Sequence, residues 1–257
     1  MKSVELFLVL IGFVGYVASQ ATSTSDYCDP SLCYGSPHTG CNNTMEFAAD
    51  CVEPEIVPMD EAHKKAIVDM HNTYRNSIAS GNMTGFNPCP RMATMQWNEE
   101  LAFLAMYNTR TCVYAHDQCH NTKQFPSAGQ NIGMNMQSTK HTDSNINLSK
   151  SVVTTCWNEY KDASMKDINS YPPNPPKVVG HFTQMCIEKS NGVGCHAVKF
   201  RNTNYNNMYT YYLVCNYAKI FEYYGQIYSS GPTASKCKTG TNPNYKGLCS
   251  VNEVYEK

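Results

Sequence analysis

One histidine is marked out by its neighbours. The stretch VVGHFTQMC, residues 178–186, places His181 inside an otherwise apolar, strand-like run. An imidazole in that setting either belongs to a site that binds ligands or transfers protons, or is a core side chain held by a hydrogen bond. The sequence contains no G-x-S-x-G and no H-E-x-x-H motif, so neither a hydrolase elbow nor a zinc-protease helix supports catalysis.

The cysteines and the first residues indicate the compartment. Lys2, a short apolar run and small residues at 17–19 are typical of a secretory signal peptide over residues 1–19. The chain has 13 cysteines, which in an exported protein predict disulfides, and the odd number leaves at least one thiol unpaired. We therefore expect a secreted, extracellular protein. Three N-x-S/T sequons are candidates for glycosylation: Asn42, Asn82 and Asn147.

Charge and length exclude some partners. The formal net charge of −1 provides no field that would attract nucleic acid, so no nucleic-acid partner is expected. After the signal peptide no apolar stretch is long enough to span a membrane. The 257 residues suit one domain with tails.

Apolar periodicity predicts helices first and strands later. Spacings of three and four residues predict helices over 60–81, 98–112 and 149–163, and residues 128–133 suggest a short helical turn. YPPNPP at 171–176 stops any helix. Strands are predicted over 177–187, 193–200 and 208–217. Helices followed by a small antiparallel sheet indicate an α+β fold.

Several motifs then occur in the order known from one family. GHFTQM (180–185) and YLVCNYA (212–218) resemble the two signatures of the CAP superfamily, which comprises cysteine-rich secretory, antigen 5 and pathogenesis-related proteins. HNTYRNSIASG (71–81), HDQC (116–119) and GQNIG (129–133) occupy the places that the family gives them. The cysteine-rich N-terminal segment and the tail are similar to insect venom antigen 5 and to antigen 5-related proteins of fly saliva.

The resemblance implies a fold and a division of the chain. It implies a disulfide-rich, three-layer α-β-α sandwich around a small three-stranded antiparallel sheet. Residues 20–58 would form a cysteine-rich segment packed on the core, residues 59–218 the CAP domain, and residues 219–257 an extension with its own cysteine pair.

The antigen 5 pattern also implies a disulfide map. The expected pairs are Cys28–Cys41, Cys33–Cys119, Cys51–Cys112, Cys195–Cys215 and Cys237–Cys249. Cys156 and Cys186 occupy positions that are unusual for the family, in a helix and the strand expected beside it. A sixth bridge, Cys156–Cys186, is therefore a further expectation, with Cys89 left as the odd thiol.

The resemblance further implies a cavity lined by two histidines and two acidic residues. Carried over, these are His116, His181, Glu159 and Gln130, and Gln130 stands where relatives often have an acid. Two imidazoles and one carboxylate form a weak candidate metal site, because a divalent ion needs charge compensation as well as geometry. We expect no required cofactor and at most weak zinc binding. A hydrogen-bonded structural cluster is the favoured interpretation.

These observations lead to one functional hypothesis and one alternative. The hypothesis is a secreted, non-enzymatic antigen 5-like binding protein of salivary type that acts as a monomer and a potential allergen. It would sequester a small lipid of fatty-acid or eicosanoid type, or engage a host protein. The alternative is a metal-dependent hydrolase that uses the His/Glu cavity.

Overall fold

The computed structural model describes residues 27–255, so the predicted signal peptide lies outside the described residues. Helices and strands alternate along the chain rather than forming two blocks. The helices are α1 (Glu61–Ala79), α2 (Glu99–Thr109), α3 (Asn145–Asn158), α4 (Met165–Asn169) and α5 (Gly180–Cys186). The strands are β1 (Val52–Ile56), β2 (Gln96–Trp97), β3 (Gly129–Gln137), β4 (Gly192–Asn202) and β5 (Met208–Tyr217).

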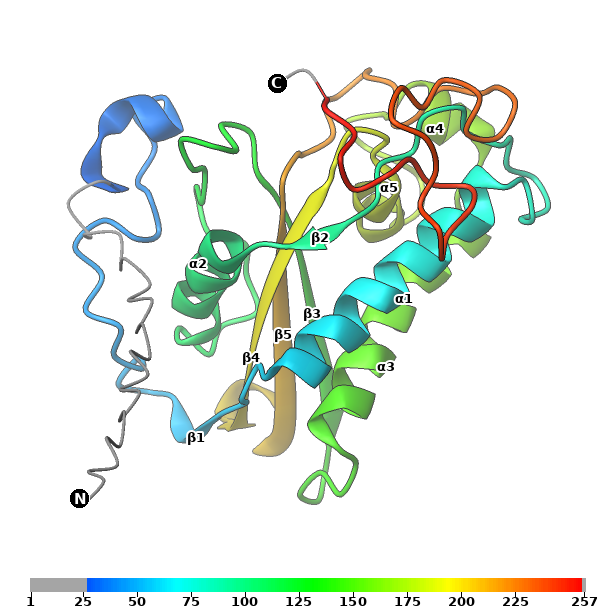
Figure 1. Ribbon diagram of the computed structural model, residues 1–257. Coiled ribbons are helices and arrows are strands. Elements are labelled where there is room, and N and C mark those ends of the chain that lie inside the picture. The colour runs from blue at the N-terminus through cyan, green and yellow to red at the C-terminus, as the bar shows by residue number, and fades with distance from the viewer. Residues whose placement is uncertain (1–26, 256–257) are drawn as a thin grey trace, which may run out of the picture.

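The sheet separates two layers of helices, which confirms the predicted sandwich. Its strand order is β1-β4-β5-β3, all antiparallel, and the short β2 pairs in parallel with β4. Helix α2 packs on β4 and β5 from one side, whereas α1 and α3 pack together on the other side (Figure 1). The three long strands therefore form the centre of the fold, as expected, and β1 and β2 extend it.

Strand alternation divides the core between the two faces. In β5, Tyr211 and Leu213 face the α1/α3 layer, whereas Tyr212 and Val214 face α2. This period of two is the pattern of a strand buried on both sides. Gly194 of β4 lies against the start of α2, where an added Cβ would come within 2.2 Å of a backbone nitrogen. Glycine is therefore required for α2 to approach the sheet.

The strand predicted over 177–187 is wrong, because this stretch forms the helix α5. Phe182, Met185 and Cys186 are completely buried, and the polar Thr183 and Gln184 between them are buried as well, so no exposed face marks the helix. A short apolar run of this kind carries no periodicity that separates a helix from a strand. The side-chain carboxylate of Glu159 accepts the backbone N–H groups of His181 and Phe182 and so caps the first turn.

The helical turn predicted over 128–133 is also wrong. This stretch begins β3, which pairs with β5 from Gly129↔Tyr217 to Gln137↔Tyr209. Its two glycines hid the strand pattern, since glycine is depleted in strands. Both glycines lie under neighbouring side chains: an added Cβ at Gly133 would come within 2.4 Å of Val152 on α3.

Five disulfides are present, and they are the five pairs that the antigen 5 pattern implied. One lies within the N-terminal segment, and two join that segment to the region after α2. One joins β4 to β5, and one closes a loop in the tail. In chain order they are Cys28–Cys41, Cys33–Cys119, Cys51–Cys112, Cys195–Cys215 and Cys237–Cys249.

The expected sixth bridge, Cys156–Cys186, is not formed. Both residues are buried thiols, as is Cys89. Cys156 lies on α3 against β3, with its sulfur near Gly133. Cys186 ends α5 and has Arg75 and Cys89 as electrostatic neighbours. The bridge depended on reading 177–187 as a strand beside α3. Burial raises the pKa of the Cys156 thiol to about 12, which keeps it protonated and unreactive.

A buried arginine on α1 holds the chain between α5 and β4. The Arg75 side chain has no exposed surface, and its guanidinium donates only to backbone carbonyls. The acceptors are the carbonyl oxygens of Ala93, Met185, Ile187, Glu188 and Ser190, at 2.8–3.3 Å. A single side chain thus donates to the end of α5 and to the segment after it, where Ile187 and Glu188 also accept backbone N–H groups.

Two histidines, the buried His71 and the partly buried His196, are neutral at physiological pH. His71 donates from Nδ1 to the Ile67 carbonyl, which can only accept, so its Nε2 accepts from the Tyr217 hydroxyl. Burial lowers the pKa of His71 to about 4, because the charged imidazolium loses its hydration. Burial likewise lowers the pKa of His196 to about 4.

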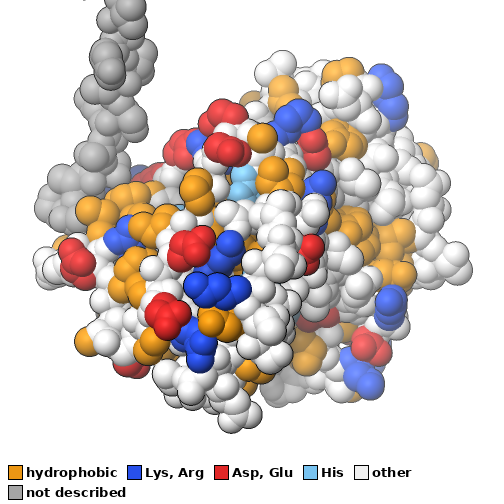
Figure 2. Space-filling view, turned by 90° about the horizontal axis from the view of Figure 1, so that it is seen from below, with side chains coloured by type: hydrophobic (Ala, Val, Ile, Leu, Met, Phe, Trp, Pro, Cys, Tyr) orange, Lys and Arg blue, Asp and Glu red, His pale blue; other side chains and the backbone are white. Residues whose placement is uncertain are grey.

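The surface is mixed in charge. Figure 2 shows acidic and basic side chains interleaved over the face seen from below. Within residues 27–255, no helix combines the length and the apolar character needed to cross a bilayer.

We expect Arg75→Met to lower the free energy of unfolding by about 3 kcal/mol or more. Methionine fills similar space but leaves several buried carbonyl groups without a donor, and each such group costs about 1–3 kcal/mol. Urea unfolding measures the change. Arg201→Met is the matched control, since Arg201 stacks over Tyr209 at the surface and should lose less than about 1 kcal/mol. Equal losses in both variants would contradict the role given to Arg75.

The buried histidines predict an acid-sensitive fold. A histidine with a pKa of about 4 in the folded state and about 6.5 when unfolded binds a proton on unfolding between these values. Stability is therefore highest above pH 6.5 and falls as the pH decreases toward 4. Urea unfolding at several pH values between 6.5 and 5 should show this slope. In His71→Gln, unfolding should take up about one proton less, so the slope of the unfolding free energy against pH should fall by about 1.4 kcal/mol per pH unit. An unchanged slope would show that His71 does not contribute to the acid sensitivity.

Candidate functional site

The predicted site residues surround one cavity of about 510 Å³ at the end of the sheet where α5 begins. Three of the four residues carried over from the family, His116, Gln130 and His181, line it directly. The remaining lining is mostly apolar: Asn131, Tyr171, Pro175, Pro176, Lys177, Val178, Val179, Gly180 and Phe221. Such a volume fits a small molecule.

Glu159 lies behind His181, and both of its carboxylate oxygens accept hydrogen bonds. Its Oε1 accepts from His181 Nδ1 at 2.6 Å, and its Oε2 accepts the backbone N–H groups of His181 and Phe182 at 2.8 and 3.1 Å. The carboxylate therefore orients the imidazole and caps α5 at once. Since Nδ1 donates to Glu159, the Nε2 atom of His181 remains for the cavity.

His116 is held in the same manner by an amide instead of an acid. Its Nδ1 donates to Gln130 Oε1 at 2.8 Å. The amide nitrogen of Gln130 in turn donates to Asp117 Oδ2 at 2.8 Å and to Asn216 Oδ1 at 2.9 Å. These two acceptors fix which end of the amide faces His116. A glutamate at position 130 would place its carboxylate against that of Asp117.

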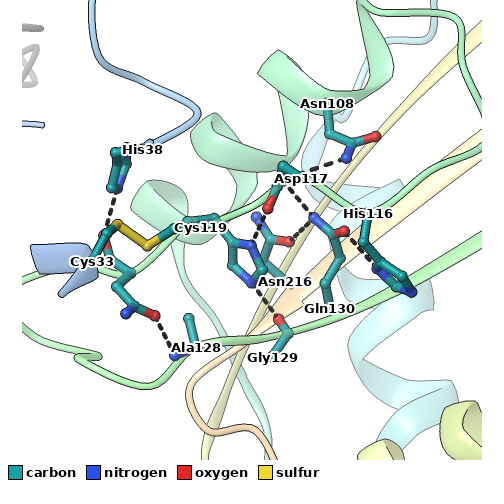
Figure 3. A network of polar contacts seen from close by, with 12 residues as sticks. Cys33, His38, Asn108, His116, Asp117, Cys119, Ala128, Gly129, Gln130 and Asn216 are labelled. Carbon is teal, nitrogen blue, oxygen red and sulfur yellow. Dashed lines mark hydrogen bonds and ion pairs between the residues drawn. A yellow bond between two sulfur atoms is a disulfide. The ribbon is translucent and has the colours of Figure 1, made fainter. Parts of the chain in front are cut away.

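Sequence reasoning missed Asp117 and His120, which form the centre of this network (Figure 3). The His120 ring contacts the Asp117 carboxylate through Nδ1 and the Gly129 carbonyl through Nε2, at 3.0 Å for the second contact. Burial alone would raise the pKa of Asp117, but hydrogen bonds from His120, Gln130 and Asn108 outweigh it and hold the pKa below its ordinary value. The HDQC motif was the available signal, since it contains Asp117 and precedes His120.

The N-terminal segment packs beside this network. Figure 3 shows the Cys33–Cys119 disulfide next to the Asp117 cluster, with His38 on the same side. His38 Nε2 donates to the Asn121 carbonyl at 2.7 Å. The loop that carries His116 is thus anchored by a disulfide and hydrogen bonds to residues about 80 positions earlier.

A buried chain of hydrogen bonds connects α1 to the cavity. The Tyr217 hydroxyl donates to His71 and accepts from the Asn131 amide at 3.2 Å. The same amide nitrogen donates to the His181 carbonyl at 3.1 Å. The neutral state of His71 therefore contributes to the placement of the backbone that carries His181.

The two histidines are presented in the form that metal-binding histidines have. Each donates from Nδ1 to a fixed oxygen and leaves Nε2 toward the cavity. No third ligand accompanies them: among residues 27–255, no group of three His, Cys, Asp or Glu side chains is placed to hold a metal ion. The residues that line the cavity in this described part also include no serine, threonine or cysteine that could act as a nucleophile.

Comparisons with known proteins agree with this architecture. The profile of the CAP family (cysteine-rich secretory protein family) matches residues 68–217. The chain is 37% identical to Venom allergen-1 of Aedes aegypti over an alignment of 254 residues, and this alignment covers 95% of each protein. It is 31% identical to Antigen 5 like allergen Cul n 1 of Culicoides nubeculosus over an alignment of 209 residues. This alignment covers 77% of this chain and 92% of that protein.

The fold has solved counterparts. The crystal structure of NaASP2 with Zn²⁺ aligns with a TM-score of 0.62 at 24% identity, over 79% of this chain and all of that one. BmVAL-1 aligns with a TM-score of 0.58 at 22% identity, over 78% of this chain and 98% of that one. This chain belongs to the CAP family, and its relatives include venom allergens and antigen 5 proteins of insects.

We propose that the His116/His181 pair binds zinc only weakly at neutral pH. Two imidazoles supply fewer donors than a closed or catalytic zinc site uses, and Glu159 would have to release α5 to become the third. Calorimetry should give a shallow isotherm for the wild type and none for His181→Ala or His116→Ala. His141→Ala is the control, because His141 does not line the cavity. Tight one-to-one binding accompanied by zinc-dependent hydrolysis would contradict this expectation.

Proposed function

We propose that this chain is a secreted, non-enzymatic binding protein that carries a small lipid of fatty-acid or eicosanoid type. The observation that carries the proposal is a groove of about 410 Å³ on the surface between α1 and α3. The α1–α3 groove is lined by Ala62, Lys65, Ala66, Asp69, Met70, Thr73, Tyr74 and Lys150. Two alanines one turn apart leave room beside the helix, so an acyl chain could lie along it.

The predicted apolar stripe of α1 divides at this groove. Ile67 and Ile78 are completely buried and belong to the core, whereas Met70 and Tyr74 are half-buried and face the groove. The Tyr74 ring stacks on Trp157 at 4.6 Å, which gives the groove a rigid aromatic wall. These side chains therefore offer apolar contact area beyond what the core needs.

The charges of the groove favour a carboxylate ligand. Lys65 is paired with Asp69 one turn along α1. Lys150 of α3 has no ion pair within the described part of the chain, so its ammonium group is available to an anionic head group. An apolar groove with one available cation suits a fatty acid better than a sterol or an amine.

Secretion and the absence of catalysis are parts of the same proposal. The cysteine pattern, the predicted signal peptide and the insect venom allergen relatives support an extracellular, allergen-like protein. The absence of serine, threonine and cysteine among the described cavity residues and the occupation of Glu159 as a helix cap support a non-enzymatic role. A salivary source and a host-protein partner remain expectations that come from the family resemblance alone.

Titration with a fluorescent fatty acid tests lipid binding. The wild type should bind it saturably and in competition with unlabelled fatty acid. Lys150→Glu should weaken binding about tenfold or more, since charge reversal opposes the carboxylate, and Ala66→Phe should weaken it by filling the groove. Lys140→Glu is the matched control: it makes the same charge change at an exposed lysine outside the groove.

Two outcomes would reject the groove. A flat titration for the wild type across several lipid classes would favour a protein partner. Wild-type affinity in Lys150→Glu and Ala66→Phe, combined with a loss in His181→Ala, would move the ligand to the His116/His181 cavity.

A further inference from the structure

Apolar side chains are exposed on the two segments that contribute Val178 and Phe221 to the lining of the cavity, away from the α1–α3 groove. Val178, Ile220, Tyr223 and Tyr224 are exposed by 70%, 39%, 61% and 73%. We call these four residues the apolar tip. They come from the loop before α5 and from the chain after β5, which Figure 1 shows passing near α4 and α5. A group of exposed apolar residues of this kind marks an interaction surface.

The apolar tip is held in place by Tyr171 rather than loosely attached. The Tyr224 N–H donates to the Tyr171 carbonyl at 2.7 Å, and the Tyr171 N–H donates to the Gly225 carbonyl at 3.0 Å. The buried Tyr171 ring packs on Phe221 at 4.1 Å and on Tyr223 at 6.3 Å. The two segments therefore form one supported unit that presents its outer side chains.

Tyr224 also adopts a backbone conformation that bulky residues avoid. Its φ is +63°, in the left-handed region, where a side chain with a Cβ costs free energy. The Gly225 N–H closes the turn by donating to the Glu222 carbonyl at 3.0 Å. The strained turn therefore keeps an aromatic side chain 73% exposed, a position that contributes little to the core.

Unpaired cations flank the apolar tip. Lys177 precedes Val178, and Lys219 precedes Ile220; neither forms an ion pair within residues 27–255. Two carboxylates lie nearby. Glu188 is engaged, since its Oε2 accepts the Ser229 N–H at 2.7 Å, and Glu222 is exposed. A hydrogen bond from a neutral N–H leaves the charge of Glu188 in place, so both carboxylates count. The exposed Lys189 lies on the same surface as Lys219, and three lysines against two glutamates leave the rim with a net charge of +1.

We propose that the apolar tip docks this protein on membrane surfaces that contain anionic phospholipids. The tyrosines and aliphatic side chains would enter the interfacial region, where amphipathic aromatic rings are favoured, and Lys177 and Lys219 would contact lipid phosphates. Four side chains on two short segments are few for a stable protein interface, which buries about 800 Å² on each partner. A bilayer requires no matching shape, so it is the partner that this surface fits.

Docking in this way would bring the cavity to the bilayer. Val178 belongs to the apolar tip and also lines the cavity, and Phe221, which supports Tyr171, lines it too. The inference does not rest on lipid binding in the α1–α3 groove, because none of the tip residues lines that groove.

Sedimentation with unilamellar vesicles tests the proposal. The secreted protein, without the predicted signal peptide, should pellet with vesicles of phosphatidylcholine and phosphatidylserine and much less with phosphatidylcholine alone. Tyr223→Ser combined with Tyr224→Ser should reduce binding at least tenfold. Lys177→Gln combined with Lys219→Gln should also reduce it about tenfold and weaken its dependence on salt.

Matched controls separate docking from general stickiness. Tyr34→Ser removes a tyrosine that is 83% exposed elsewhere, and Lys140→Gln removes an exposed lysine. Both should bind like the wild type, and thermal unfolding should show that all variants fold. If the wild type does not pellet with the anionic vesicles, membrane docking is rejected and the exposed tyrosines belong to a protein interface. If the control variants lose as much binding as the tip variants, the proposed surface is wrong.

Discussion

The geometry of the cavity depends first on the buried guanidinium of Arg75. Helix α5 has only seven residues, and the chain that leaves it forms no strand until Gly192, so its carbonyl groups need a donor from elsewhere. Arg75 supplies that donor from α1 and thereby fixes the C-terminal end of α5, while Glu159 fixes the N-terminal end. His181 thus stands on a short helix held at both ends by charged side chains from other elements. The guanidinium has no carboxylate partner, so the dipoles of the carbonyl groups alone stabilise its buried positive charge. The backbone that carries these carbonyl groups must therefore stay in place around it.

Polar residues around the cavity are mostly engaged with one another. Glu159 serves the helix terminus, and Asp117 binds His120 and Gln130. This explains the amide at position 130: its nitrogen must donate to Asp117 and to Asn216, which a carboxylate cannot do. What the site offers to a ligand is therefore reduced to two imidazole nitrogens and the ammonium group of Lys177 within mostly apolar walls. Such an arrangement holds the loop and the sheet in place, and its chemistry toward other molecules is correspondingly mild.

The parts of the fold that could be predicted from the sequence are those with a local signal. Helix α1 has a capping Asp60 and a clear apolar stripe, and α2 begins at the capping Asn98, so both were placed within a few residues. The stretches 129–137 and 180–186 lacked such signals. The first contains two glycines and is a strand because β5 pairs with it. The second is buried from Phe182 to Cys186 and is a helix whose first turn is capped by Glu159. His116 and His181 were found through the family resemblance, whereas Asp117 and His120 stood in a polar, irregular segment where only the folded chain reveals their contacts.

The disulfides are distributed unevenly over the sandwich, and this has a mechanical consequence. The N-terminal segment is stapled to the layer that contains α2, and β4 is stapled to β5, but no disulfide of the described residues ends on α1, α3 or α5. One half of the molecule is thus a cross-linked frame, while the other is joined to it only by side-chain packing and hydrogen bonds. Helices joined in this way can shift against the frame without breaking a covalent bond. Substitutions on α1 and α3 can therefore change the packing and the surface of that half while the cross-linked frame stays intact.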